Sequence, residues 1–128
     1  MKKNLLFDTD VLIDFLKGRD EAITFLESQA LQWFISTVTV AELYAGVREG
    51  NEKIILENFI ETFTILPISI NIAQKGGLFR RDYGKSKGIG LADALIAATA
   101  EEYDLTLVTL NRKHFSMITN LHVPYNKQ

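Results

Sequence analysis

Residues 5–16, LLFDTDVLIDFL, place three apolar residues directly before an Asp-Thr-Asp triplet and a second apolar run. The segment from Asn4 to Phe7 is typical of a buried strand, and the pattern from Asp10 to Lys17 predicts a helix that Gly18 can end. A buried strand that leads straight into a helix is typical of a parallel α/β sheet. The triplet between them holds a phosphoryl-accepting nucleophile, one corner of a metal site or only a helix cap.

The rest of the chain continues this alternation of short apolar strands and helices. Further strands are predicted over residues 31–36, 63–68, 106–110 and 122–125. Further helices are predicted over residues 20–29, 38–49, 51–62, 71–83 and 91–103, with a helical turn at 112–115. We therefore predict one α/β domain over residues 1–128, with a central parallel sheet flanked by helices on both faces. In such sheets, ligands bind beyond the carboxyl ends of the strands.

The composition restricts the function classes. A net charge of −2 argues against a protein that coats nucleic acid through charge alone. The chain has no cysteine, which excludes disulfides and thiolate metal sites and favours a reducing cytoplasm. A charged residue follows only three apolar residues at the N-terminus, too early for a signal peptide, and no apolar run is long enough to span a membrane. We expect a soluble cytoplasmic protein.

Three acidic residues stand in otherwise apolar segments. Asp8 directly follows the first strand, Glu42 is the only charged residue between positions 33 and 47, and Asp93 is the only one between positions 88 and 100. A buried carboxylate without a partner is strongly disfavoured, and basic residues are scarce in these segments. A hard cation with oxygen ligands, Mg²⁺ or Mn²⁺, is the economical partner.

Each acid, taken alone, has a simpler explanation. Asp8 can cap the first helix, and Asp93 lies in the first turn of its helix, where the helix dipole favours a negative charge. Glu42 is harder to explain in this way, because it lies in the middle of a helix among apolar neighbours. The coincidence of the three favours one shared site.

Two other functions are compatible with parts of the sequence. A phosphatase of the haloacid dehalogenase class uses Asp-x-Asp-x-Thr/Val after its first strand, with the first Asp as nucleophile. The chain has both acids, but Leu12 stands where Thr or Val is expected, and the later Lys and Gly-Asp-x-x-x-Asp elements are missing. A non-catalytic RNA-binding or partner-binding domain is the other alternative, and the intact trio of acids argues against it.

The pattern as a whole resembles the PIN domain, in particular the VapC-type toxin ribonucleases of type II toxin-antitoxin systems. The likeness is carried by DTDVLIDFLKG (8–18), STVTVAELYAG (36–46), GIGLADALIAATAEEYDLTLVTLN (88–111) and TLNRKHF (109–115). It covers essentially the whole chain. The resemblance implies a PIN-like fold and a Mg²⁺- or Mn²⁺-dependent endoribonuclease, in which water activated by the metal hydrolyses RNA and leaves 5′-phosphate and 3′-OH ends.

The resemblance also implies roles for individual residues. Asp8, Glu42 and Asp93 match the metal ligands, and Asn111 matches a fourth catalytic position where many members have Asp. An Asn brings no charge there, so the number of metal ions stays open.

Other residues are expected to support this site. Thr9 and Thr109 match hydroxyl positions that support the metal shell or its water, and Asp10 is expected to cap a helix or support the same shell. Asp14, one turn later, is expected to face solvent, and His122 to be structural.

The resemblance further implies partners. The residues expected to contact RNA phosphates are Arg80, Arg81, Lys85, Lys87, Arg112 and His114. The substrate class implied by analogy is a tRNA or a ribosomal RNA loop. VapC-like proteins are usually homodimers, neutralised by a small VapB-like antitoxin in a groove near the active site. The candidate groove contacts are Phe25, Leu26, Tyr44 and Phe59, for which an ordinary place in the core is the alternative.

Overall fold

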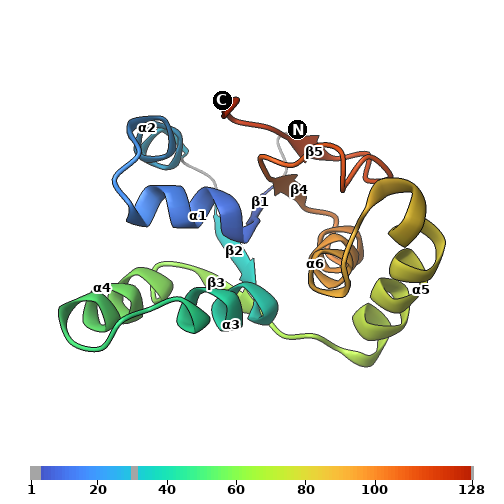
Figure 1. Cartoon of the computed structure of the whole chain (residues 1–128), viewed down its shortest axis with the longest axis horizontal. Helices are drawn as coiled ribbons and strands as arrows, with labels where there is room; N and C mark the ends of the chain where they lie inside the picture. The colour runs from blue at the N-terminus through green and yellow to red at the C-terminus, as the bar shows by residue number, and fades with distance from the viewer. Residues whose placement is uncertain (1–3, 30–31, 128) are drawn as a thin grey trace.

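A five-stranded sheet, seen between two groups of helices in Figure 1, forms the centre of the computed structural model, which describes residues 4–29 and 32–127. The strand order is β3-β2-β1-β4-β5, and every neighbouring pair is parallel. The strands are β1 (Leu5–Phe7), β2 (Trp33–Ser36), β3 (Thr64–Leu66), β4 (Thr106–Val108) and β5 (Leu121–His122). This confirms the predicted α/β class and parallel sheet; Leu31, placed in the second predicted strand, lies outside the described residues.

Side chains of the central strand β1 alternate between two cores. Leu5 and Phe7 belong to one apolar cluster, and Leu6 belongs to the other. All three are buried, as expected for a strand covered on both faces. Each core therefore lies between one face of the sheet and one group of helices.

In the described part of the chain, six helices cover the two faces of the sheet. They are α1 (Thr9–Leu16), α2 (Asp20–Ser28), α3 (Thr37–Ala45), α4 (Asn51–Ile60), α5 (Ile70–Lys87) and α6 (Leu91–Glu102). In Figure 1, α1, α2 and α4 lie to the left, α3 lies below β2 and β3, and α5 and α6 lie to the right. Asp8 is the N-cap of α1, because its Oδ1 accepts from the Thr9 amide at 2.8 Å. The structure places Arg19, not Asp20, at the N-cap of α2.

The helix predicted over residues 71–83 is longer in the structure. It runs from Ile70 to Lys87, so the segment expected to be a loop is partly helical. Gly76 does not weaken it, because its missing side chain lets α5 approach α6: a Cβ at Gly76 would lie 3.1 Å from the Cα of Leu95. The helix ends where Gly88 adopts a φ of 72°. The predicted helical turn at 112–115 is instead a series of turns.

Across the described segments, we find no helix with both the length and the apolar character needed to cross a bilayer.

Candidate functional site

The site begins where the two central strands end. The amide of Asp8, just after β1, donates to the carbonyl of Val108 at the end of β4, at 2.8 Å. This pairing brings Asp8 next to Thr109, although the two are far apart in the sequence. The hydroxyl of Thr109 donates to Asp8 Oδ2 at 2.7 Å, and both side chains are buried. The parallel sheet thus fixes one carboxylate and one hydroxyl at its carboxyl edge.

Asp10 faces the same strand end from the first turn of α1. Its Oδ2 accepts from the Leu110 amide at 3.1 Å and lies 3.4 Å from the Thr109 hydroxyl. Its Oδ1 accepts from the Val11 amide at 2.7 Å. Asp10 therefore does not cap the helix; it ties α1 to the loop after β4.

A second group forms around Asp93 in the first turn of α6. Nδ1 of His114 lies 3.3 Å from Asp93 Oδ2 and 2.9 Å from the amide nitrogen of Asn111. The backbone amide of Asn111, distinct from the side-chain nitrogen beside His114, donates to the Thr109 hydroxyl at 3.1 Å. The loop after β4 therefore links Asp93 to the Asp8 side of the site.

Glu42 on α3 reaches the site through Thr9. The Thr9 hydroxyl donates to Glu42 Oε1 at 2.6 Å and lies 3.1 Å from the hydroxyl of Thr39. Thr39 is buried and was not predicted; its position three residues before Glu42, on the same helix face, was the available signal. The expectation that Glu42 is buried among apolar neighbours is wrong, because this position of the short helix α3 is exposed.

Burial and mutual repulsion dominate the electrostatics of the site. Burial and the charges of Asp10 and Asp93 raise the pKa of Asp8 from its ordinary 3.8 to about 8, against the opposing effect of the Thr109 hydrogen bond. Burial also raises the pKa of Asp10, although its amide partners favour the ionised form. The charge of Asp93 acts on both Asp8 and Asp10, and this concentration of negative charge favours a bound cation.

The donor chemistry fits a hard divalent ion. The acids, Asn111 and the two threonines present oxygen atoms, which Mg²⁺ and Mn²⁺ prefer. Within residues 4–29 and 32–127, no three acidic or imidazole side chains already stand close enough to enclose an ion. The carboxylates of Asp8, Asp10 and Glu42 instead accept hydrogen bonds from neighbouring protein groups. Their side chains would therefore have to rotate to bind one ion together. The structure thus brings the predicted residues into one neighbourhood but does not place them around a common point.

The raised pKa of Asp8 predicts how the stability of the metal-free protein depends on pH. Between about pH 4 and pH 8, the folded state binds more protons at Asp8 than the unfolded state does. The contribution of Asp8 to stability is therefore present at low pH and is lost as the pH rises through this window. We expect the thermal midpoint, measured in EDTA, to fall from pH 5 to pH 8.5 less steeply in Asp8→Asn than in the wild type. Parallel profiles would show that Asp8 titrates normally.

Asp14 was predicted to face solvent, and this prediction is wrong. Its side chain is buried, with 5% of the residue exposed. The hydroxyl of Tyr125 and the amine of Lys127 each donate to it at 2.8 Å. These partners lie more than a hundred residues away in the sequence, so helical periodicity could not reveal them.

The basic residues expected to contact RNA lie at the C-terminal half of α5 and in the loop after β4. Arg80, Arg81 and Lys85 on α5 are exposed, as is Arg112, and Lys87 is half-buried. Arg81 pairs with Asp82 at 2.8 Å. His114 lies beside Gly88 at the end of α5, which joins the basic end of this helix to the Asp93 group.

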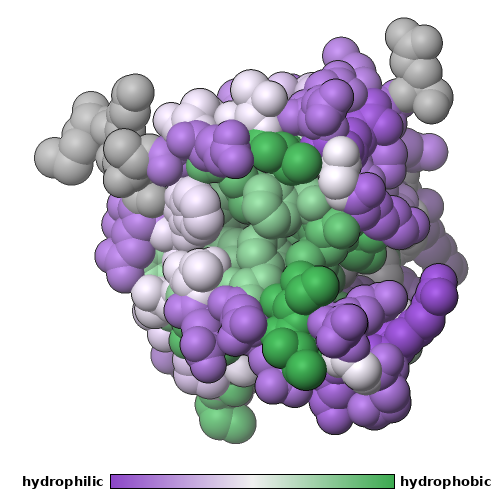
Figure 2. Space-filling view, turned by 90° about the vertical axis from the view of Figure 1, so that its left-hand side faces the viewer, coloured by the Kyte–Doolittle hydropathy of each residue, from purple (hydrophilic) through white to green (hydrophobic). Residues whose placement is uncertain are grey.

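An apolar groove runs from Glu42 along the outside of α1, α3 and α4. Its volume is about 480 Å³. Its apolar lining consists of Ile13, Leu16, Leu43, Val47, Ile55 and Leu56. Figure 2, which faces this side of the molecule, shows an apolar area framed by hydrophilic side chains.

The candidate groove contacts chosen from the sequence do not line this groove. Leu26 is fully buried, and Phe25, Tyr44 and Phe59 are partly buried against the same core. Phe59 stacks on Phe15, with ring centroids 5.0 Å apart. The alternative interpretation, an ordinary place in the core, describes all four better.

Comparisons with known proteins give one consistent result. The PIN domain family model matches residues 5–119. Ribonuclease VapC10 of Mycobacterium tuberculosis is 38% identical over 126 residues, covering 94% of this chain and 92% of the relative. Ribonuclease VapC1 of Rickettsia felis is 35% identical over 127 residues, covering 93% of each.

Solved structures agree with the sequence relatives. A toxin-antitoxin complex from Klebsiella pneumoniae contains a chain that matches with a TM-score of 0.86 and 35% identity, covering 97% of this chain and 100% of that one. FitAcB from Neisseria gonorrhoeae matches with a TM-score of 0.76 and 30% identity, covering 94% and 97%.

Proposed function

The chain belongs to the PIN domain family, together with the VapC ribonucleases, and on this premise we propose that it is a divalent-metal-dependent endoribonuclease and the toxin of a toxin-antitoxin pair. The ribonuclease and toxin assignments follow from relatives that match nearly the whole chain. We propose Mg²⁺ or Mn²⁺ as the ion, and a homodimer as the oligomeric state.

We assign the proposed metal ligands to Asp8, Glu42 and Asp93, with Asn111 as a neutral oxygen donor beside them. A bound divalent ion would supply a water of lowered pKa and stabilise charge on the phosphoryl oxygens. The neighbouring residues orient these side chains: Thr109 holds Asp8, Thr9 holds Glu42, and His114 lies against Asp93. Such supporting contacts fix ligand geometry and tune affinity for the ion.

The observation that carries this proposal is that the loop after β4 contacts Asp8, Asp10 and the Asp93 group at the carboxyl edge of the sheet. Asp10 accepts hydrogen bonds from two backbone amides, so it is a poor candidate for the general acid/base that the phosphatase alternative needs beside Asp8. The test is cleavage of RNA with and without Mn²⁺ by the wild type and by Asp8→Asn. Cleavage that persists in EDTA would contradict the proposal.

We propose that RNA approaches over the basic end of α5. Arg80, Arg81 and Lys85 are exposed there. Gly88, at the end of the same helix, lies beside His114, which contacts Asp93. Exchanging Arg80 and Lys85 for Glu is expected to raise KM for RNA roughly tenfold at low salt and to leave kcat nearly unchanged, because these residues would contact phosphates and not the reacting atoms. The matched control is Lys53→Glu on α4. An unchanged KM would place the RNA on another face.

We propose that the antitoxin occupies the groove along α1, α3 and α4. The lining of the groove is largely apolar and also includes the charged residues Lys17, Arg48, Glu52 and Glu42. This lining suits an amphipathic segment with one apolar face. Because Glu42 is one of the proposed ligands, a segment in the groove would reach the catalytic site and block it.

A further inference from the structure

A buried acid that the proposed mechanism does not use ties the C-terminal tail to α1. Asp14 lies four residues after Asp10, so the two carboxylates leave the same face of the helix one turn apart. Tyr125 donates to Asp14 Oδ2, and Lys127 donates to Oδ1, each at 2.8 Å. Both oxygens of Asp14 are therefore bonded to the tail.

These contacts satisfy the Asp14 carboxylate despite its burial. Burial opposes ionisation, but the hydrogen bonds from Lys127 and Tyr125 outweigh it and hold the pKa of Asp14 below its ordinary value. Burial and the bond to Asp14 raise the pKa of the Tyr125 hydroxyl above its ordinary value. Arg19 adds a third contact, with its guanidinium carbon 5.3 Å from the centre of the Tyr125 ring.

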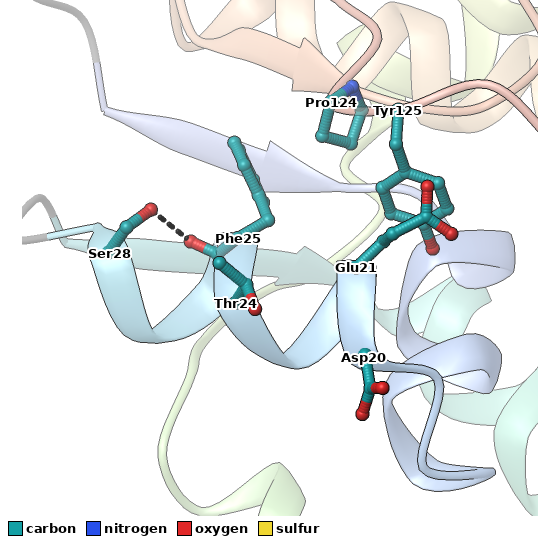
Figure 3. Close-up of a pocket in the computed structure, with 7 residues that line it drawn as sticks. All are labelled: Asp20, Glu21, Thr24, Phe25, Ser28, Pro124 and Tyr125. Carbon is teal, nitrogen blue, oxygen red and sulfur yellow. Dashed lines mark hydrogen bonds between the residues drawn. The ribbon is translucent and has the colours of Figure 1, made fainter.

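The tail is held by side chains and not by the sheet. The last backbone bond of β5 runs from the Thr109 amide to the His122 carbonyl at 3.1 Å. Within the described part of the tail, residues 123–127, no backbone hydrogen bond follows. Figure 3 shows Pro124 and Tyr125 on one side of a pocket of about 400 Å³ and the α2 residues, among them Glu21 and Phe25, on the other.

Two segments of the C-terminal region contact α1 near the proposed catalytic edge of the sheet. The loop after β4 holds Asp8 and Asp10 through Thr109 and Leu110, and the tail after β5 holds Asp14 one turn further along α1. β4 and β5 are neighbours in the sheet. The loop after β4 and the tail after β5 therefore contact α1 at two successive turns. The charge of Asp10 also acts on the Tyr125 hydroxyl, which places the tail within electrostatic reach of the site.

We propose that the Tyr125–Asp14–Lys127 contact is a brace that sets the position of α1, so that Asp14 and Tyr125 are positioning residues for the metal site. This inference rests on the proposed function. A shift of α1 would move Asp8, its N-cap, and Asp10 relative to Asp93, which is carried by a different helix. The brace therefore acts through Asp8 and Asp10 on affinity for the ion, and not on contact with RNA.

The test measures Mn²⁺ binding to the RNA-free, full-length protein, with electron paramagnetic resonance as the method of detection. Tyr125→Phe removes only the hydroxyl, and we expect it to weaken Mn²⁺ binding roughly three- to tenfold. At saturating Mn²⁺, kcat is expected to recover and KM for RNA to stay unchanged. Asp14→Asn, which keeps an oxygen that can accept from Tyr125, should lose less affinity than Asp14→Ala. Tyr103→Phe, at an exposed tyrosine at the end of α6, is the matched control.

Three outcomes separate the possibilities. Unchanged Mn²⁺ affinity in Tyr125→Phe, with a lowered thermal midpoint, would show that the tail only stabilises the fold and would overturn the inference. Equal losses in Asp14→Asn and Asp14→Ala, with no loss in Tyr125→Phe, would also overturn it. A wild type that neither binds Mn²⁺ nor cleaves RNA would instead refute the proposed function, and the inference with it.

Discussion

Replacing Asp8 by Asn is expected to reduce Mn²⁺-dependent RNA cleavage by at least about a thousandfold, because it removes a charged ligand while leaving the shape of the side chain. Asp93→Asn is expected to have the same effect from the other side of the site. The fold should survive the Asp8 change, because the Asn oxygen can still accept from the Thr9 amide and the Asn NH₂ group can donate to the Thr109 hydroxyl in place of the second carboxylate oxygen. The measurement is the initial rate of cleavage at saturating Mn²⁺.

The matched control for this prediction is Asp20→Asn. Asp20 is an exposed acid in the first turn of α2, so the same chemical change there should leave the rate within about twofold of the wild type. Circular dichroism and thermal unfolding establish that each variant is folded. Turnover by a folded Asp8→Asn or Asp93→Asn protein at the wild-type rate would remove these residues from the catalytic site.

The second large effect is expected at the antitoxin groove. Ile55→Asp places a charge on the apolar lining of the groove, and we expect it to weaken binding of the cognate VapB-like antitoxin by about 30- to 100-fold. The physical reason is that the partner's apolar side chains would bury this charge without a counter-ion. Ile55 is 59% exposed, so the change should cost little stability in the free protein.

The neighbouring residue supplies the control for the groove. Ile54 is 56% exposed on the same helix but does not line the groove, so Ile54→Asp matches Ile55→Asp in chemistry and exposure. Calorimetric titration of both variants with the antitoxin compares them directly. Equal affinities for the two variants would place the antitoxin elsewhere on the toxin.

The local features of the fold could be predicted from the sequence. The apolar run before Asp8 indicated a strand buried on both faces, and β1 fulfils this with Leu6 in one core and Phe7 in the other. The alternation of strands and helices was sufficient for a parallel sheet, because each parallel strand pair needs a crossover. Motif order placed Asp8, Asp93 and Asn111 in one neighbourhood, and the loop after β4 joins them in the structure.

Features that depend on distant contacts could not be predicted. The burial of Asp14 is created by the tail, 111 residues away at Tyr125, and local polarity pointed the other way. The close approach of Gly76 on α5 to Leu95 on α6 was equally invisible, because a glycine inside a predicted helix indicates only a weak point of the isolated helix. The exposure of Glu42 shows that apolar neighbours in the sequence do not by themselves bury a side chain, here one that lines the groove.

The most direct test of the account is a Mn²⁺ titration of the RNA-free protein, because its central claim is that separated acids bind one divalent ion together. We predict saturable binding by the wild type, a loss of affinity of at least about tenfold in Asp8→Asn and Asp93→Asn, and tighter binding in Asn111→Asp. Wild-type affinity in both Asp→Asn variants would contradict the claim.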